Sequence, residues 1–233
     1  MVSRETVSRE TSTPGPAPAS IQALFPDDIP VLTRYAQLLA TAGVERGLIG
    51  PREVPRLWER HLLNCAVVEE LVPRDVTLAD VGSGAGLPGV VLATVRPDLQ
   101  VTLIEPLLRR ATFLEEAVDT LGLGNVEVVR ARAEELRGRT FTAVTARAVA
   151  PLPRLAGWCA PLITPGGWML ALKGDRAADE LSAAAAELEW AGLREPRVVR
   201  VGPEDGARTT VVVMRKDGPT RPSTKRTKGA GRR

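Results

Sequence analysis

Four glycines lie close together in residues 80–89, directly after an apolar run that is typical of a buried strand. Glycine lets the backbone turn sharply and lets a ligand approach without meeting a Cβ atom. A carboxylate, Glu105, ends the next apolar run, at about the 20-residue distance where nucleotide-binding α/β folds place a ribose hydroxyl acceptor. The loop, with Gly82 and Gly84, and Glu105 therefore predict a site for an adenosine-containing cofactor.

Several kinds of loop compete for this glycine pattern. A Walker phosphate loop is disfavoured because no Gly-Lys-Ser/Thr follows, whereas residues 84–89 match the Gly-x-Gly-x-x-Gly of a dinucleotide fold. A methyltransferase loop also carries an acid two residues before its first glycine, and Asp80 supplies that acid. Asp80 could accept a hydrogen bond from a methionine ammonium or hold the loop. The alternative to a binding loop is a tight strand-to-helix turn that holds no ligand.

Glu134 comes shortly after the third strand-like run, where folds of this kind commonly place an acid against an adenine edge. Its neighbour Ala133 is small enough for a ring to lie against it. Glu134 could equally cap the following turn or be solvated. We therefore add Ala133 and Glu134 to the candidate cofactor residues.

These residues need a sheet that brings several strand ends together. From residue 76 onward strand-like and helix-like runs alternate, which is typical of a parallel sheet covered on both faces. The last two strands are separated by residues 203–208 only and are expected to form an antiparallel hairpin. Strands are predicted at 77–81, 101–105, 126–130, 143–147, 168–173, 197–201 and 209–215, and helices at 87–95, 107–121, 152–162 and 176–191.

Two helical patterns precede the sheet. Asp28 and Pro30 favour a helix start, followed by apolar residues at helical spacing. A second helix is expected over residues 53–71, after a loop at 43–51. We expect the chain to divide into a disordered segment (1–20), a helical extension (21–74), the α/β domain that carries the glycine loop (75–216) and a basic disordered tail (217–233).

The net charge of +3 is unevenly distributed. Residues 215–233 hold eight Lys/Arg and one Asp, so the rest of the chain is net negative. Such a tail attracts polyanions without specificity, or serves solubility alone. In the N-terminal segment Val-Ser-Arg-Glu-Thr occurs at 2–6 and again at 7–11, and we hypothesise that this repeat reflects a DNA-level signal.

Cys65 and Cys159 lie in apolar helical patterns, and we expect free buried thiols, as in a cytoplasmic protein. No apolar run reaches the ~20 residues that span a bilayer, so no membrane association is expected. We also expect no metal site. The four tryptophans, at 58, 158, 168 and 190, are expected mainly in the core.

Several segments resemble the bacterial small-subunit ribosomal RNA guanine-N7 methyltransferases, also known as the glucose-inhibited division protein B family. The resemblance covers about residues 25–216 and implies a class I S-adenosylmethionine-dependent methyltransferase: a Rossmann-like α/β fold with a mostly parallel seven-stranded sheet, a C-terminal antiparallel hairpin and an N-terminal helical extension. It implies cofactor contacts at Gly82, Leu87, Ala133, Glu134 and Arg147. The segments that carry it are 60–62, 80–89, 103–106, 109–110, 113–115, 145–152 and 171–174.

The family's reaction implies S-adenosylmethionine as cofactor and 16S ribosomal RNA, or the small ribosomal subunit, as partner. Guanine N7 is an unprotonated lone pair, so its methylation needs alignment and desolvation but no general base. No catalytic residue is assigned with certainty. His61, Arg147 and Lys173 are positioning candidates, the last two toward phosphates or guanine O6. The alternatives are that His61 only packs, and that Arg147 and Lys173 cap carbonyls at strand ends or pair with Asp175.

The extension departs from the family pattern at residues 41–48 and at Asn64-Cys65, which bears on RNA docking more than on cofactor binding. Arg109 and Arg110 open a helix, where cations are mildly unfavourable, and this favours a polyanion contact. Three other functions stay open. They are methylation of another RNA, small molecule or protein; cofactor sensing or RNA binding without turnover; and a nicotinamide oxidoreductase.

Overall fold

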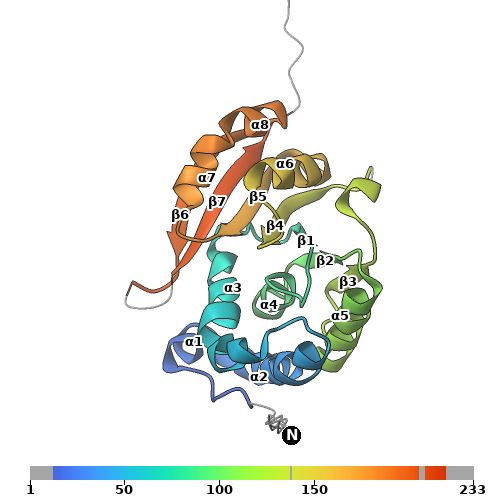
Figure 1. Ribbon diagram of the computed structural model, residues 1–233, viewed down its shortest axis with the longest axis vertical. Coiled ribbons are helices and arrows are strands. Elements are labelled where there is room, and N and C mark those ends of the chain that lie inside the picture. Colours follow the sequence, from blue (N-terminus) through green and yellow to red (C-terminus); the bar gives the residue numbers. More distant parts are fainter. Residues whose placement is uncertain (1–12, 137, 205–207, 219–233) are drawn as a thin grey trace, which may run out of the picture.

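The computed structural model describes residues 13–136, 138–204 and 208–218. The N-terminal repeat and the tail beyond residue 218 lie outside these described residues. Within them, one sheet of seven strands lies between two layers of helices (Figure 1). No helix in the described part of the chain is long and apolar enough to cross a membrane.

The sheet has the strand order β3-β2-β1-β4-β5-β7-β6 and is parallel except for β7, which is antiparallel to both of its neighbours. The prediction of a parallel sheet with a C-terminal antiparallel hairpin is thus confirmed. The order reverses between β1 and β4, where open α/β sheets bind their ligands. The strands are β1 Thr77–Val81, β2 Gln100–Ile104, β3 Val126–Val129, β4 Phe141–Arg147, β5 Ile163–Lys173, β6 Leu193–Val201 and β7 Thr209–Lys216.

The N-terminal extension, α4 and α5 cover one face of the sheet, and α6, α7 and α8 cover the other (Figure 1). Successive side chains of a strand point to opposite faces. Leu78 therefore packs in the core beneath the extension, α4 and α5, and Ala79 packs in the core beneath α6, α7 and α8. The α-helices are α1 Ala19–Leu24, α2 Ile29–Leu38, α3 Asn64–Ala66, α4 Gly89–Val95, α5 Leu108–Leu121, α6 Leu152–Cys159, α7 Ala177–Ala183 and α8 Ala185–Trp190.

The extension is less regular than the sequence predicts. The single helix expected over residues 53–71 is a chain of short pieces, in which Pro55 lies inside the first and removes a backbone donor. The predicted loop after residue 43 likewise begins with more helix. The short 3-10 or π segments are η1 Pro26–Asp28, η2 Leu39–Gly43, η3 Pro51–Arg56, η4 Leu57–Leu63, η5 Val67–Leu71, η6 Ala133–Glu135 and η7 Ala160–Leu162.

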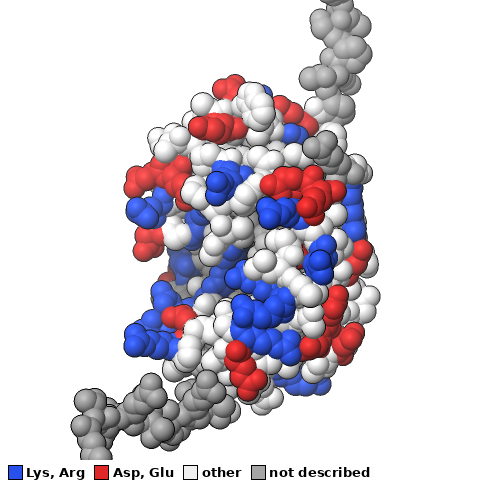
Figure 2. Space-filling view, turned by 45° about the vertical axis from the view of Figure 1, so that its right-hand side comes forward, with Lys and Arg blue, Asp and Glu red and all other residues white. Residues whose placement is uncertain are grey.

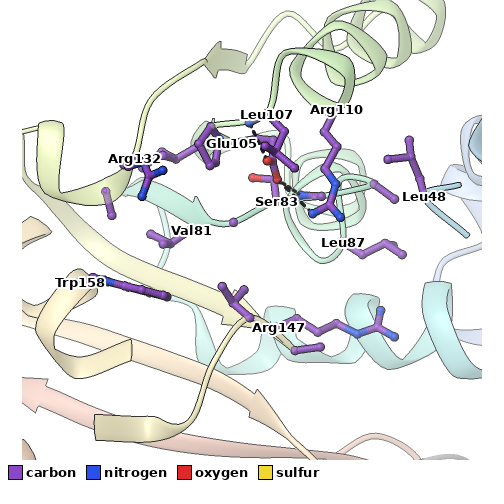
Figure 3. Close-up of a pocket in the computed structure, with 18 of the residues that line it drawn as sticks. Leu48, Val81, Ser83, Leu87, Glu105, Leu107, Arg110, Arg132, Arg147 and Trp158 are labelled. Atoms are coloured by element: carbon purple, nitrogen blue, oxygen red, sulfur yellow. Dashed lines mark hydrogen bonds and ion pairs between the residues drawn. The ribbon is translucent and has the colours of Figure 1, made fainter. Parts of the chain in front are cut away.

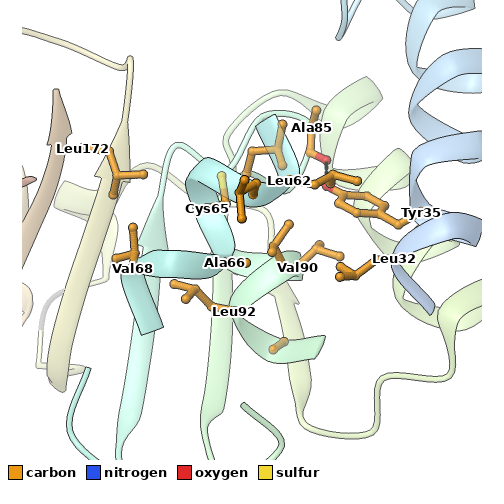
Figure 4. Close-up of a cluster of buried hydrophobic side chains, with 14 of the residues drawn as sticks. Leu32, Tyr35, Leu62, Cys65, Ala66, Val68, Ala85, Val90, Leu92 and Leu172 are labelled. Carbon is orange, nitrogen blue, oxygen red and sulfur yellow. Dashed lines mark hydrogen bonds between the residues drawn. The ribbon is translucent and has the colours of Figure 1, made fainter. Parts of the chain in front are cut away.

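Tyr35 of α2 joins the extension to the glycine loop (Figure 4). Its ring is fully buried beside Leu62 and Val90, and its hydroxyl donates a hydrogen bond to the Ala85 carbonyl at 2.5 Å. Burial also raises the pKa of this hydroxyl well above its usual value. The extension is therefore part of the main core and supports the loop directly.

The structure differs from the predictions in two peripheral places. Trp190, predicted to be buried, is 89% exposed at the end of α8, and the prediction was wrong there. Residues 13–20 are not detached from the body, since Trp58 Nε1 donates to the Gly15 carbonyl at 2.7 Å and α1 already begins at Ala19. The cysteines are free and buried as predicted.

Arg96, which follows α4, fastens the end of the extension to the sheet domain. Its guanidinium donates to the carbonyls of Val72 and Pro73, each at 3.0 Å, and to that of Glu69 at 3.1 Å. Asp98 accepts two further bonds at 2.7 Å, which hold the pKa of Asp98 far below its usual range. Arg96 is only 8% exposed, so its guanidinium is buried among these acceptors.

Replacing this guanidinium should loosen the extension. Arg96→Ala removes the side-chain donor from the carbonyls of Val72 and Pro73 and leaves Asp98 without its cation, and we expect it to lower the free energy of unfolding by about 2 kcal/mol. Urea denaturation measures the change. The control is Arg74→Ala, an exposed arginine nearby, which should alter stability by less than about 0.5 kcal/mol. Equal effects of the two substitutions would show that Arg96 does not fasten the extension.

Candidate active site

A cavity of about 560 Å³ opens at the carboxyl ends of β1, β2 and β4 (Figure 3). This is the crevice where the strand order reverses. Its wall includes most of the predicted site residues: Gly82, Gly84, Leu87, Glu105, Ala133, Glu134, Arg147 and His61. The sequence prediction therefore assembled one site from segments that are far apart in the chain.

The loop after β1 forms the floor of this cavity. The backbone N–H groups of Gly82 and Ser83 donate to the Ile104 carbonyl at 2.8 and 3.1 Å, which ties the loop to the end of β2. Gly82 has a φ of +72°, and a Cβ atom there would lie 2.9 Å from Val149. Glycine is required at this position because both the backbone conformation and the close neighbour exclude a side chain.

Asp80 lies beneath the loop and does not line the cavity. Its side chain is fully buried, and Oδ2 accepts a hydrogen bond from the Gly89 N–H at 3.0 Å. Burial raises the pKa of Asp80 to about 7, against the hydrogen bond from Gly89. Oδ1 is buried without a partner among the described residues. Of the two interpretations of Asp80, this geometry matches the one in which it holds the loop.

Glu105 is the buried acid of the cavity and is only 2% exposed. Oε2 accepts the Gly84 N–H and Oε1 accepts the Leu107 N–H, each at 3.0 Å. Arg110 from α5 approaches Oε2 at 3.8 Å. Each carboxylate oxygen keeps a further lone pair, so Glu105 can still accept hydrogen bonds from a ligand.

The adenine side of the predicted site is mostly apolar. Ala133 is buried and lines the cavity together with the neighbouring Glu134. Leu107 and Trp158 complete this part of the wall (Figure 3). A flat apolar ring with a polar edge fits such a surface.

Arg147 ends β4 and turns toward the extension. Its Nη2 donates to the His61 ring at 2.8 Å and to the Arg60 carbonyl at 3.2 Å, and its Nη1 donates to Cys65 Sγ at 3.2 Å. Both Arg147 and His61 line the cavity. The structure thus brings together two of the three positioning candidates.

The third candidate, Lys173, lies in a separate cavity of about 640 Å³. Its ammonium donates to the Ala150 carbonyl and to Glu180, each at 2.9 Å, so its acidic partner is Glu180 and not Asp175. This second cavity shares Ala148 and Val149 with the first. Ala148 has a φ of +54°, an uncommon conformation for a residue with a side chain, at the boundary between the two.

Several wall residues were not predicted to contact a cofactor. Leu48 and Ile49 come from the extension, and no local signal in the sequence connects them with the glycine loop. Arg132 and Trp158 also line the cavity. Arg110 had been assigned to a polyanion contact, and its position one turn into α5, five residues after Glu105, was the signal that could have placed it here.

The fold and this donor set define a class I S-adenosylmethionine-dependent methyltransferase. The buried carboxylate of Glu105 fits the ribose of this cofactor, and the arginines of the wall fit its amino-acid carboxylate. The glycine loop lets the cofactor lie close to the protein backbone. A methyltransferase from Aquifex aeolicus described as dependent on this cofactor has the same fold, with a TM-score of 0.53 at 21% identity over 72% of this chain and 98% of that chain. An O-methyltransferase from Thermotoga maritima gives a TM-score of 0.52 at 16% identity, over 71% of this chain and 70% of that chain.

Sequence comparison assigns the family. The model of the GidB family, described as rRNA small subunit methyltransferase G, matches residues 28–208, and the chain belongs to this family. Among its relatives, the ribosomal RNA small subunit methyltransferase G of Streptomyces avermitilis is 61% identical over 189 residues, 80% of this chain and 79% of the relative. The protein of the same name from Thermobifida fusca is 62% identical over 77% of this chain and 76% of the relative.

Proposed function

We propose that this protein methylates N7 of a guanine in 16S ribosomal RNA, in the cytoplasm and without a metal ion. The observation that carries the proposal is the pair of adjoining cavities at the carboxyl edge of the sheet, in a chain of the rRNA small subunit methyltransferase G family. When bound, S-adenosylmethionine supplies a methyl group activated by a sulfonium.

The first cavity provides the cofactor contacts. Glu105 accepts hydrogen bonds from the ribose hydroxyls through its remaining lone pairs. Ala133 and Glu134 receive the adenine ring and its edge. Arg147 would pair with the amino-acid carboxylate of the cofactor, and residues 82–85 and Leu87 would lie along its methionine part. Asp80 acts from beneath the loop and keeps Gly89 in place.

The second cavity provides the substrate contacts. Guanine carries hydrogen-bond donors on its Watson–Crick edge and acceptors at O6 and N7. Glu180 offers carboxylate oxygens and Lys173 an ammonium in one cavity, so they can bind both kinds of group. Because N7 bears no proton, the residues need only orient the base, exclude water and face the methyl group across Ala148 and Val149.

Basic side chains surround this region. Figure 2 shows Lys and Arg gathered across the middle of one face of the molecule, around a hollow. Arg110, Arg132 and Arg147 line the first cavity and Arg176 lines the second. Cations in this arrangement favour the phosphates of RNA, so we expect binding of the substrate to weaken as salt rises.

The proposal is tested with small ribosomal subunits from cells that lack the gene. We expect the purified protein to transfer a labelled methyl group to one guanine, which strand cleavage at alkylated guanines then maps. Lys173→Met should lower this transfer about tenfold or more, as for loss of a charged hydrogen bond, and leave binding of S-adenosylhomocysteine unchanged. Transfer to another atom or another RNA would overturn the proposal, as would binding of NADH in place of S-adenosylhomocysteine.

A further inference from the structure

His61 lies between the carboxylate of Glu53 and the guanidinium of Arg147 at the wall of the cofactor cavity. Its Nδ1 is 2.8 Å from Arg147 Nη2, and its Nε2 is 2.9 Å from Glu53 Oε2. The three residues come from η3, η4 and β4, so the chain of contacts runs from the extension to the sheet. The His61 side chain is 14% exposed, and that of Glu53 is 33% exposed.

The chemistry of the partners fixes which ring nitrogen carries the proton. A guanidinium has only donors, so Nδ1 must be the bare nitrogen that accepts from Arg147. Nε2 then bears the hydrogen and donates to Glu53, and this bond lowers the pKa of Glu53. The arrangement holds only for a neutral imidazole, because a proton on Nδ1 would face the N–H of Arg147.

The extension supplies every hydrogen-bond partner of the Arg147 guanidinium found in the described residues. Nη2 is shared by His61 and the Arg60 carbonyl, and Nη1 contacts Cys65. A guanidinium has five N–H groups, so two are left for a ligand in the cavity. The direction of those two donors depends on where His61 holds Nη2.

We propose that His61, oriented by Glu53, is a positioning residue that aims Arg147 at the cofactor, and that protonation of His61 releases Arg147 and weakens cofactor binding. The inference rests on the proposed contact between Arg147 and the amino-acid carboxylate. It adds Glu53 and gives His61, already a positioning candidate, a specific role: both act on the cofactor through Arg147.

The charges around His61 set the pH at which this occurs. Burial lowers the pKa of His61 from 6.5, Arg147 and Arg60 lower it further, and Glu53 opposes them. The neutral ring therefore persists below pH 6.5, and affinity for the cofactor is expected to fall only as the pH drops through the lowered value. Two further titratable groups interact with Arg147, Cys65 through a hydrogen bond and Asp80 through its charge. Arg56 interacts electrostatically with Glu53.

The titration of His61 must be distinguished from that of Asp80, because the pKa of Asp80 is raised to about 7 and lies in the same pH range. His61→Asn makes this distinction: the Asn side chain places an acceptor near the position of Nδ1 but cannot titrate. Because this variant also loses the bond to Glu53, we expect it to bind S-adenosylhomocysteine about tenfold more weakly at pH 7.5, as Glu53→Ala does, but to show no decline on the acid side. Calorimetry from pH 5 to 8 measures both quantities.

Glu53→Ala removes the acceptor for Nε2–H and should weaken S-adenosylhomocysteine binding about tenfold at pH 7.5, since a bond to a charged group is lost. The matched control is Glu59→Ala, an exposed acid on the same stretch, which should have no effect. Thermal melting of each variant shows whether it folds.

His61 is the only histidine of the chain, so its ring can be observed directly in the unmodified protein. Nitrogen NMR of the untagged, histidine-labelled chain should show a neutral ring with hydrogen on Nε2 and a pKa below 6.5. Hydrogen on Nδ1, or the same acid decline in His61→Asn as in the wild type, would overturn the inference. Failure to methylate RNA with these results intact would count against the proposed function alone.

Discussion

Glu105→Gln is expected to weaken S-adenosylhomocysteine binding about 100-fold, a larger loss than the roughly tenfold one expected for Glu53→Ala. Both carboxylate oxygens already accept backbone N–H groups, from Gly84 and Leu107, in a site that is only 2% exposed. An amide turns one acceptor into a donor that faces one of these N–H groups. It also leaves Arg110 without its anion at 3.8 Å.

Isothermal calorimetry with S-adenosylhomocysteine measures this loss, and Glu115→Gln on the exposed side of α5 is its control. The control removes the same charge from the same region but should keep wild-type affinity. Binding of Glu105→Gln within about threefold of the wild type would show that the acid only shapes the loop. The ribose contact would then have to be assigned to another residue.

The sheet could be predicted because its information is local. Each buried strand is a short apolar run, and the glycine loop and Glu105 both follow such runs directly. Parallel pairing then places the ends of β1, β2 and β4 at one edge, so the residues after these strands had to meet. This is why the loop with Gly82 and the acid Glu105 could be placed at one edge from the sequence, whereas Arg147 was named through the family resemblance.

The contacts within the site could not be predicted from the sequence because they join segments without a shared local signal. Arg147 and His61 are 86 positions apart, and their hydrogen bond depends on how the extension packs. Lys173 ends β5 one strand further from the cofactor cavity, and Glu180 reaches it from α7. Periodicity gives the apolar face of an irregular segment such as η3 and η4, but not its path.

Gly86→Ala is expected to destabilise the fold by about 4 kcal/mol, from backbone strain and from overpacking of about 1–3 kcal/mol each. Gly86 has a φ of +93°, which disfavours a side chain. A Cβ atom there would also lie 2.5 Å from Val90 and 2.7 Å from the Tyr35 hydroxyl. Tyr35 cannot move aside cheaply because it is fully buried and bonded to Ala85.

Gly122→Ala separates these two causes, because Gly122 has a φ of +71° but no atom of the described residues within 4 Å of an added Cβ. We expect it to cost about 1 kcal/mol, the strain alone, in urea unfolding. In Gly86→Ala with Tyr35→Phe, loss of the hydroxyl should relieve part of the clash, so the double variant is more stable than the sum of the single effects. If Gly86→Ala costs no more than Gly122→Ala, the loop yields to the added methyl group and the extension does not fix its position.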